Sequence, residues 1–140
     1  MTTSLFKSLI SDAFTIYLTF SGILLSLITL LYSFINGKRS ELELCAEAVK
    51  SGLKDPLMKK RQNNLILQIK RISKINRLFF ILLLLSIIAC AISWVTIRFI
   101  QNKYYVLSLY IIGVFTLLIG ALSIKLMLNL YSQYKNDIKI

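Results

Sequence analysis

Apolar and polar positions follow one another along this chain in long blocks. Three apolar blocks, at residues 13–35, 78–100 and 104–128, are separated by a long basic segment and a short polar turn. The first block has 23 residues without a charge, and a helix of that length measures about 34 Å, enough to span a bilayer. The pattern therefore predicts an all-α integral membrane protein with three transmembrane helices.

The second apolar block continues a polar helix that starts at Asp55-Pro56. Aspartate suits an N-cap, and proline suits the first position of a helix. Residues 57–77 hold seven basic residues and no acid, and no glycine or proline interrupts residues 57–100. Such a helix would be roughly 67 Å long. We expect one half of it to cross the bilayer and the other half to stand in water.

The polar segment between the first two blocks predicts a helical hairpin at residues 38–77. Asn36-Gly37 indicates a helix stop, because glycine tolerates the left-handed conformation of a C-cap. Ser40 and Glu43 then have the spacing of a capping box, which predicts a separate short helix up to Ser51. The apolar residues expected to face one another are Leu42, Cys45 and Val49 on this helix and Met58, Leu65, Ile69 and Ile72 on the next. The alternative is that one or both helices lie on the membrane surface.

The charge of the chain is strongly basic and unevenly placed. The formal net charge is +11, and eleven lysines and arginines lie in residues 36–77 against four acids. The positive-inside rule then predicts a cytosolic hairpin and C-terminus, with the N-terminus outside. The residues that we expect to face anionic lipid headgroups or a partner are Lys59, Lys60, Arg61, Lys70, Arg71, Lys74 and Arg77. Nucleic acid is not an expected partner, because no aromatic residues interleave this patch.

Ser86, Cys90 and Ser93 form a short small-residue seam in the second apolar block. Longer series of small and hydroxyl-bearing residues recur at spacings of three and four along the other two blocks. They are Thr15, Thr19, Gly22, Ser26, Thr29 and Ser33 in the first block, and Gly113, Thr116, Gly120 and Ser123 in the third. Small residues let helices approach closely in a membrane, so these seams favour helix packing. The alternative is the lining of a pore formed by several subunits, which hydroxyls also suit. The seam in the first block has no charge in mid-membrane, which weakens the pore interpretation.

Residues with candidate chemistry are few. The chain has no histidine and two cysteines, Cys45 and Cys90, whose predicted depths differ too much for a disulfide. We find no phosphate loop, no metal-ligand spacing and no catalytic dyad, so we predict neither an enzyme nor a bound cofactor or metal. Asp12 and Arg98 fall near the same predicted boundary of the membrane, where an ion pair would contribute about 0–1 kcal/mol.

Three stretches carry a resemblance to a known family: residues 21–25 in the first block, residues 71–77 at the entry to the second, and the tail after Leu128. Because these three stretches occur in this order, residues 12–135 resemble a family of small bacterial membrane proteins, domain-of-unknown-function family two-seven-two-one. The resemblance implies three spans in a bacterial inner membrane and no assigned activity. Residues 36–39 depart from the family pattern, because an expected aspartate-arginine pair is missing there.

Together these features predict one membrane domain, residues 1–140, without enzymatic activity. We expect it to associate with itself or to serve as a subunit or scaffold of a membrane assembly, because one three-helix unit buries only some of its small-residue faces. The alternative is an oligomeric pore or channel, either holin-like or a membrane-disrupting effector.

Overall fold

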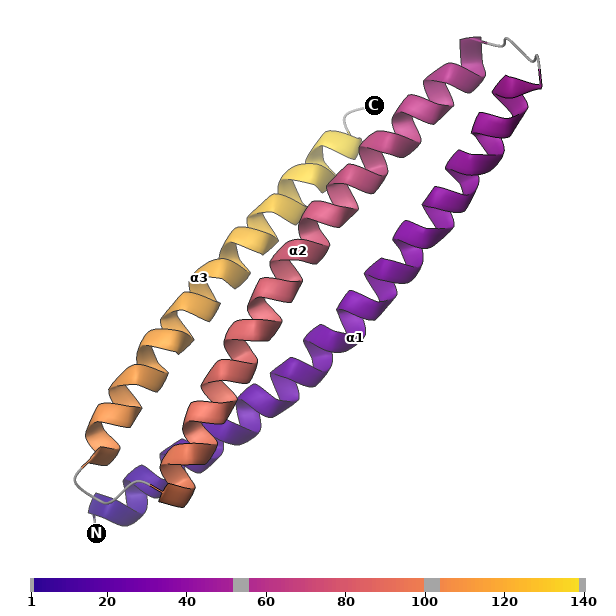
Figure 1. Ribbon diagram of the computed structural model, residues 1–140. Coiled ribbons are helices and arrows are strands. Elements are labelled where there is room, and N and C mark those ends of the chain that lie inside the picture. Colours follow the sequence, from indigo (N-terminus) through magenta and orange to yellow (C-terminus); the bar gives the residue numbers. More distant parts are fainter. Residues whose placement is uncertain (1, 52–55, 100–103, 139–140) are drawn as a thin grey trace. The chain divides into compact units, whose positions relative to one another are not determined.

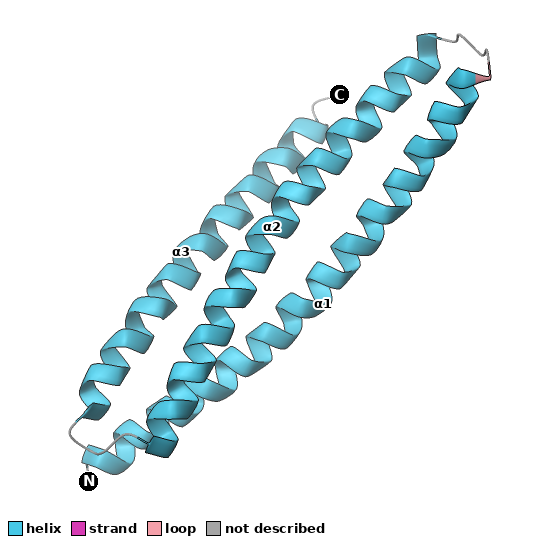
Figure 2. Ribbon diagram, viewed as in Figure 1, coloured by secondary structure: helices cyan, strands magenta, loops and turns pink. Residues whose placement is uncertain are grey.

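The computed structural model of the protein describes residues 2–51, 56–99 and 104–138. This part of the chain folds into three α-helices, α1 (Thr2–Lys50), α2 (Pro56–Phe99) and α3 (Tyr105–Ile138) (Figure 1). No strand occurs in the described ranges (Figure 2). All three helices are long and apolar enough to cross a membrane, which confirms the prediction of an all-α protein with three helices of that kind.

The predicted helix stop at Asn36-Gly37 is wrong. α1 continues through both residues as far as Lys50, so the capping box at Ser40 and the separate short helix are wrong as well. Gly37 keeps a helical backbone, and a Cβ placed on it would have open space around it in the described part of the chain. No left-handed cap forms at this position.

Local interactions explain why α1 passes through Gly37. A glycine inside a helix costs only about 1 kcal/mol relative to alanine. Lys38 and Glu41, one turn apart, form an ion pair with Nζ and Oε2 at 3.1 Å, and such a pair supports a continuous helix. Ile35 and Cys45 lie on either side of the glycine and are both buried. Packing before and after Gly37 therefore outweighs the weak tendency of glycine to end the helix.

The start of α2 agrees with the sequence. The helix begins at Pro56, where the fixed φ of proline suits the first turn. Gly52, Asp55 and the polar turn at residues 101–103 lie outside the described residues. α2 runs without interruption to Phe99, in line with the long helix predicted from the absence of glycine and proline.

The chain forms two compact units, one made of residues 1–25 with residues 80–140 and the other of residues 26–79. The first, called here the three-helix unit, contains the start of α1, the end of α2 and all of α3. The second, called here the two-helix unit, contains the end of α1 and the start of α2. Each unit has its own buried side chains and is described separately below.

Core positions in the three-helix unit recur every seven residues, which is the spacing of left-handed helix packing. The buried residues at these positions are Ile10, Tyr17 and Leu24 on α1, Leu82, Ser86, Ala89, Ser93 and Thr96 on α2, and Tyr105, Ile112, Ile119 and Leu126 on α3. Most of the buried side chains on α2 are small, whereas those on α1 and α3 are large. Small residues on α2 therefore let the other two helices bring large side chains close to it.

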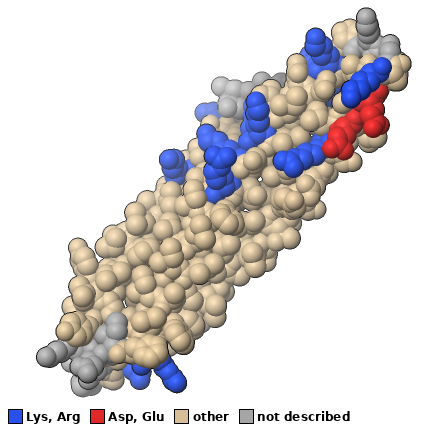
Figure 3. All heavy atoms as spheres, in the orientation of Figure 1, with Lys and Arg blue, Asp and Glu red and all other residues tan. Residues whose placement is uncertain are grey.

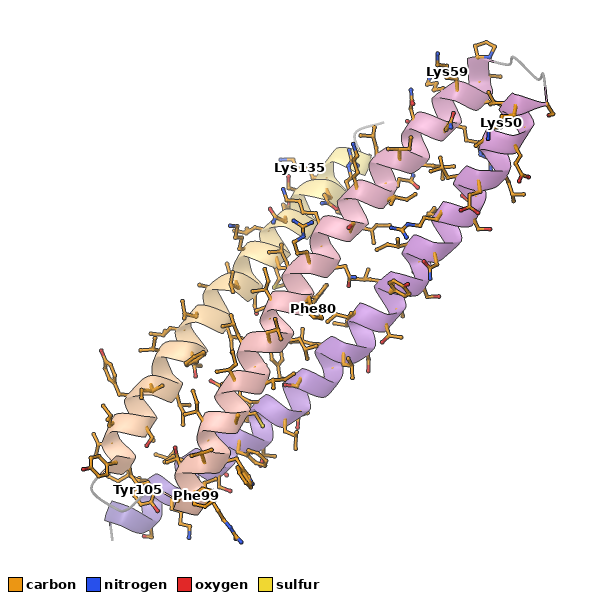
Figure 4. The ribbon with its side chains drawn as sticks, viewed as in Figure 1. Lys50, Lys59, Phe80, Phe99, Tyr105 and Lys135 are labelled. Carbon is orange, nitrogen blue, oxygen red and sulfur yellow. The ribbon has the colours of Figure 1, made fainter. Side chains whose placement is uncertain are left out.

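The two-helix unit has a smaller apolar core and a charged surface. Its buried apolar residues are Ile35, Cys45, Leu65 and Ile75. Figure 3 shows basic atoms beside acidic ones near the end of α1 and the start of α2, which Figure 4 marks with Lys50 and Lys59. Cys45 and Leu65 are buried as the predicted apolar stripes require, whereas Val49 is 37% exposed.

A polar atom is buried in the two-helix unit without a partner. The side-chain oxygen Oδ1 of Asn76 has no hydrogen-bond partner among the described residues. A buried acceptor left in this state costs on the order of 1–3 kcal/mol. Asn76 lies on α2, and its side chain as a whole is half-buried.

Candidate functional site

A cluster of hydroxyl groups joins all three helices within the three-helix unit. Ser86 on α2 donates its hydroxyl hydrogen to the backbone carbonyl oxygen of Tyr17 on α1, over 3.0 Å. Ser21 on α1 lies 2.8 Å from the same carbonyl oxygen and 2.9 Å from the Ser86 hydroxyl. Two hydroxyl hydrogens are thus shared among three short contacts. This arrangement ties α1 to α2 through the carbonyl oxygen of Tyr17.

The side chain of Tyr17 extends the cluster to α3. Its hydroxyl is hydrogen-bonded to the hydroxyl of Thr116. Thr116 already donates its one hydrogen to the carbonyl oxygen of Ile112, at 2.8 Å, so Tyr17 must be the donor in the contact between helices. Tyr17 therefore contacts α2 with its backbone and α3 with its side chain, and its position fixes the register of three helices.

Within the three-helix unit, the seam on α1 points away from this cluster. All six of its residues are exposed in the chain: Thr15, Thr19, Gly22, Ser26, Thr29 and Ser33. Successive residues turn by about 100° around a helix, so positions two residues before and after Tyr17 fall on the opposite side. Tyr17 is only 6% exposed. In the described residues, α1 therefore packs through the face of Tyr17, and its small-residue face is exposed.

The hydroxyl groups in the first part of this seam are used within α1 itself. Thr15 donates to the carbonyl oxygen of Ser11 at 3.1 Å, and Thr19 donates to that of Thr15 at 2.9 Å. Bonds of this kind satisfy the hydroxyl hydrogen without water or another helix. The face is therefore compatible with lipid or with a tightly packed neighbour.

The glycines of the seams have room for a side chain. A Cβ added to Gly22, Gly113 or Gly120 would have nothing within 4 Å beyond the backbone of its own helix, in the described part of the chain. On α3, Gly113 and Thr116 are exposed, whereas Gly120 and Ser123 are half-buried. Glycine weakens a helix interior by about 1 kcal/mol relative to alanine, and no steric conflict among the described residues requires glycine at these positions.

The predicted partners Asp12 and Arg98 are both exposed. Within residues 2–51, 56–99 and 104–138 no ion pair joins them, and the pair that does form is between Lys38 and Glu41. The connections between α1 and α2 in the three-helix unit are instead the hydroxyl contacts of Ser21 and Ser86. Uncharged hydroxyl groups, rather than that ion pair, therefore connect α1 and α2 in this unit.

The basic residues predicted on α2 all reach the surface of the two-helix unit. Lys59, Lys60, Arg61, Lys70, Arg71, Lys74 and Arg77 are exposed. Cys45 and Cys90 are free thiols, buried and half-buried. Across the described residues there is no group of three histidine, cysteine or acidic side chains able to hold a metal ion.

The fold defines a class of protein, an all-helical chain with three helices of membrane-spanning length and composition. No family model, no curated protein and no solved structure matches the chain. The resemblance to domain-of-unknown-function family two-seven-two-one therefore stays a prediction.

Proposed function

We propose that this protein is a non-enzymatic, multi-pass membrane protein that associates with itself through the small-residue face of α1. A complex with other membrane subunits would use the same face. The observation that carries the proposal is that this face is exposed and that, among the described residues, a Cβ placed on Gly22 would have open space around it. In lipid, helices associate by close backbone approach, which glycine and small hydroxyl residues permit.

The hydroxyls on this face favour packing over a water-filled lining. Thr15 and Thr19 donate their hydroxyl hydrogens to carbonyl oxygens of their own helix. These two hydroxyl groups therefore need no water molecule as a hydrogen-bond partner. An oligomeric pore, holin-like or membrane-disrupting, remains the second candidate function. It is supported by the line of hydroxyls on a single uncovered face, which a wet pathway would use.

The basic residues of α2 nearest its apolar half support binding to anionic lipid headgroups. Lys70, Arg71, Lys74 and Arg77 are exposed and lie within about 12 Å, along the helix, of the apolar stretch from residue 78. Each contributes about 1 kcal/mol of attraction to an anionic surface. We propose a bacterial inner membrane as the location, with this side in the cytosol and the N-terminus outside.

The subunit count in lipid nanodiscs tests this proposal, measured by mass photometry or native mass spectrometry. We expect a defined oligomer for the unchanged chain and a monomer for Gly22→Leu, because leucine blocks close approach of a second helix. Ala121→Leu is the matched control, since Ala121 is exposed on α3 and outside both seams. A chain that is monomeric before any substitution contradicts self-association.

Conductance across planar bilayers separates the two candidate functions. A packing seam predicts an assembly without conductance. A pore predicts conductance that changes when Ser26 or Thr29 is replaced by leucine, because the polar lining would then be interrupted.

A further inference from the structure

A polar groove lies within the two-helix unit, between the end of α1 and the start of α2. It has a volume of about 440 Å³ and is lined by Lys38 and Glu41 of α1 and by Leu57, Lys60, Arg61, Asn64, Leu65 and Gln68 of α2. Leu65 is buried at 5% exposure, whereas Lys60, Arg61, Asn64 and Gln68 are exposed. The volume falls within the range of small-molecule sites.

The spacing of the α2 residues explains why they meet in one groove. Residues 57, 61, 64 and 68 are separated by three or four positions, and residue 60 lies three positions after 57 and four before 64, which puts all five on one side of a helix. Arg61, Asn64 and Gln68 therefore form a row of hydrogen-bonding groups along this side. The first turn of α2, at Leu57, adds the positive end of the helix dipole.

The charges along the groove leave it positive. Lys38 and Glu41 neutralise one another in an ion pair of 3.1 Å. Lys60 and Arg61 have no ion-pair partner in the part of the chain that the structure describes. Two cationic groups with several donors each thus remain beside two amide side chains, which can donate to an anion as well.

From this arrangement we infer that the groove is a binding site for a phosphate-bearing anion. Arg61 presents a planar pair of donors that matches two phosphate oxygens, and Lys60 adds a second cation. Asn64 and Gln68 donate from the next turns of α2. The phosphate belongs either to a lipid headgroup or to a soluble compound, and both sources offer the same chemistry to these side chains.

This site is separate from the residues proposed above to meet the bilayer surface. Asn64 precedes Arg77 by 13 residues, which is about 20 Å along a helix. The inference does not depend on self-association through α1. A matched comparison is available on α1, because Arg39 and Lys50 are exposed, do not line the groove and are not among the residues proposed to meet the bilayer.

The test uses the full chain in phosphatidylcholine nanodiscs and inorganic pyrophosphate as the soluble probe, with binding followed by calorimetry. We expect Lys60→Gln with Arg61→Gln to weaken binding by about tenfold or more, since charge-assisted hydrogen bonds are lost. Arg39→Gln with Lys50→Gln removes the same charge and should weaken binding by less than about threefold. Asn64→Leu checks the amide contact without any change of charge.

A second arm replaces part of the lipid with phosphatidylglycerol and counts the molecules retained on the protein by native mass spectrometry. Selective loss of pyrophosphate binding in the groove variant supports a soluble ligand. Selective loss of retained phosphatidylglycerol, with no pyrophosphate binding, supports a headgroup. Equal losses in both double variants, or no binding of either probe, overturn the inference. Helical content measured by circular dichroism shows that each variant is folded.

Discussion

The two faces of α1 are built from different residues and are used differently. One face places Tyr17 and Leu24 in the core of the three-helix unit, where both are buried. The other places Thr15, Thr19 and Gly22 at the surface, where all three are exposed. Large side chains of α1 thus lie in the core of the unit, and the small ones lie at its surface.

This difference separates the free energy of unfolding from the free energy of association. In lipid, apolar exposure carries little penalty, so a helix face gains stability only from packing and hydrogen bonds. Substitutions on the face of Tyr17 should therefore change the stability of one chain. Substitutions on the face of Gly22 should instead change how chains meet.

Leu24→Ala should have the largest effect on the stability of the chain. Leu24 is 2% exposed, and its truncation leaves a cavity that costs about 2 kcal/mol, near the low end for buried leucines because lipid is itself apolar. Reversible unfolding in mixed micelles measures the change. The neighbouring Ile23 is 54% exposed, and Ile23→Ala should cost well under half as much. Equal losses would show that α1 does not have one preferred inner face.

Tyr17→Phe should have the next largest effect. It removes the hydroxyl that Tyr17 donates to Thr116 and keeps the ring, so the expected loss is about 1 kcal/mol, typical of hydrogen bonds between membrane helices. Tyr110→Phe is the control, because Tyr110 is 73% exposed. Unfolding in the same micelles compares them, and a loss as large for Tyr110→Phe would contradict the role of the cluster.

The sequence predicts the helices of this protein well because each contains a long run of apolar residues. Twenty or more apolar residues without a charge cannot be mistaken for a loop, and α2 begins at Pro56 as its proline requires. The predicted helix end at Gly37 is wrong because the residues that indicate a helix cap are few. Packing at Ile35 and Cys45 on both sides outweighs it.

The hydroxyl cluster was harder to find from the sequence. Tyr17 lies inside an apolar block and carries no polar motif, and only its spacing of seven from Ile10 and Leu24 marks it as a core residue. The small residues of α1 posed another difficulty. They suit close packing inside the chain as well as between chains, so composition alone does not say which face points inward.

Gly37→Ala tests the corrected path of α1. In a helix interior with open space at this position, alanine should stabilise the chain by about 0.5–1 kcal/mol. A glycine in a left-handed cap would give the opposite sign, because alanine is strained there. Thermal unfolding followed by circular dichroism distinguishes a gain from a loss.

Glu41→Gln should have the smallest effect on the stability of the chain, which it should lower slightly. It should raise the affinity of the groove for an anion. Glu41 is about half exposed, and its pair with Lys38 spans 3.1 Å. Loss of the pair should therefore cost at most about 0.5 kcal/mol. The same change frees Lys38 within the groove, so pyrophosphate should bind about two- to fivefold more tightly. Calorimetry on the full chain in nanodiscs measures the affinity, and unfolding in micelles measures the stability. If the affinity for pyrophosphate falls instead, Glu41 holds Lys38 in position for the anion and does not repel the anion. The Lys38–Glu41 ion pair would then be part of the binding site.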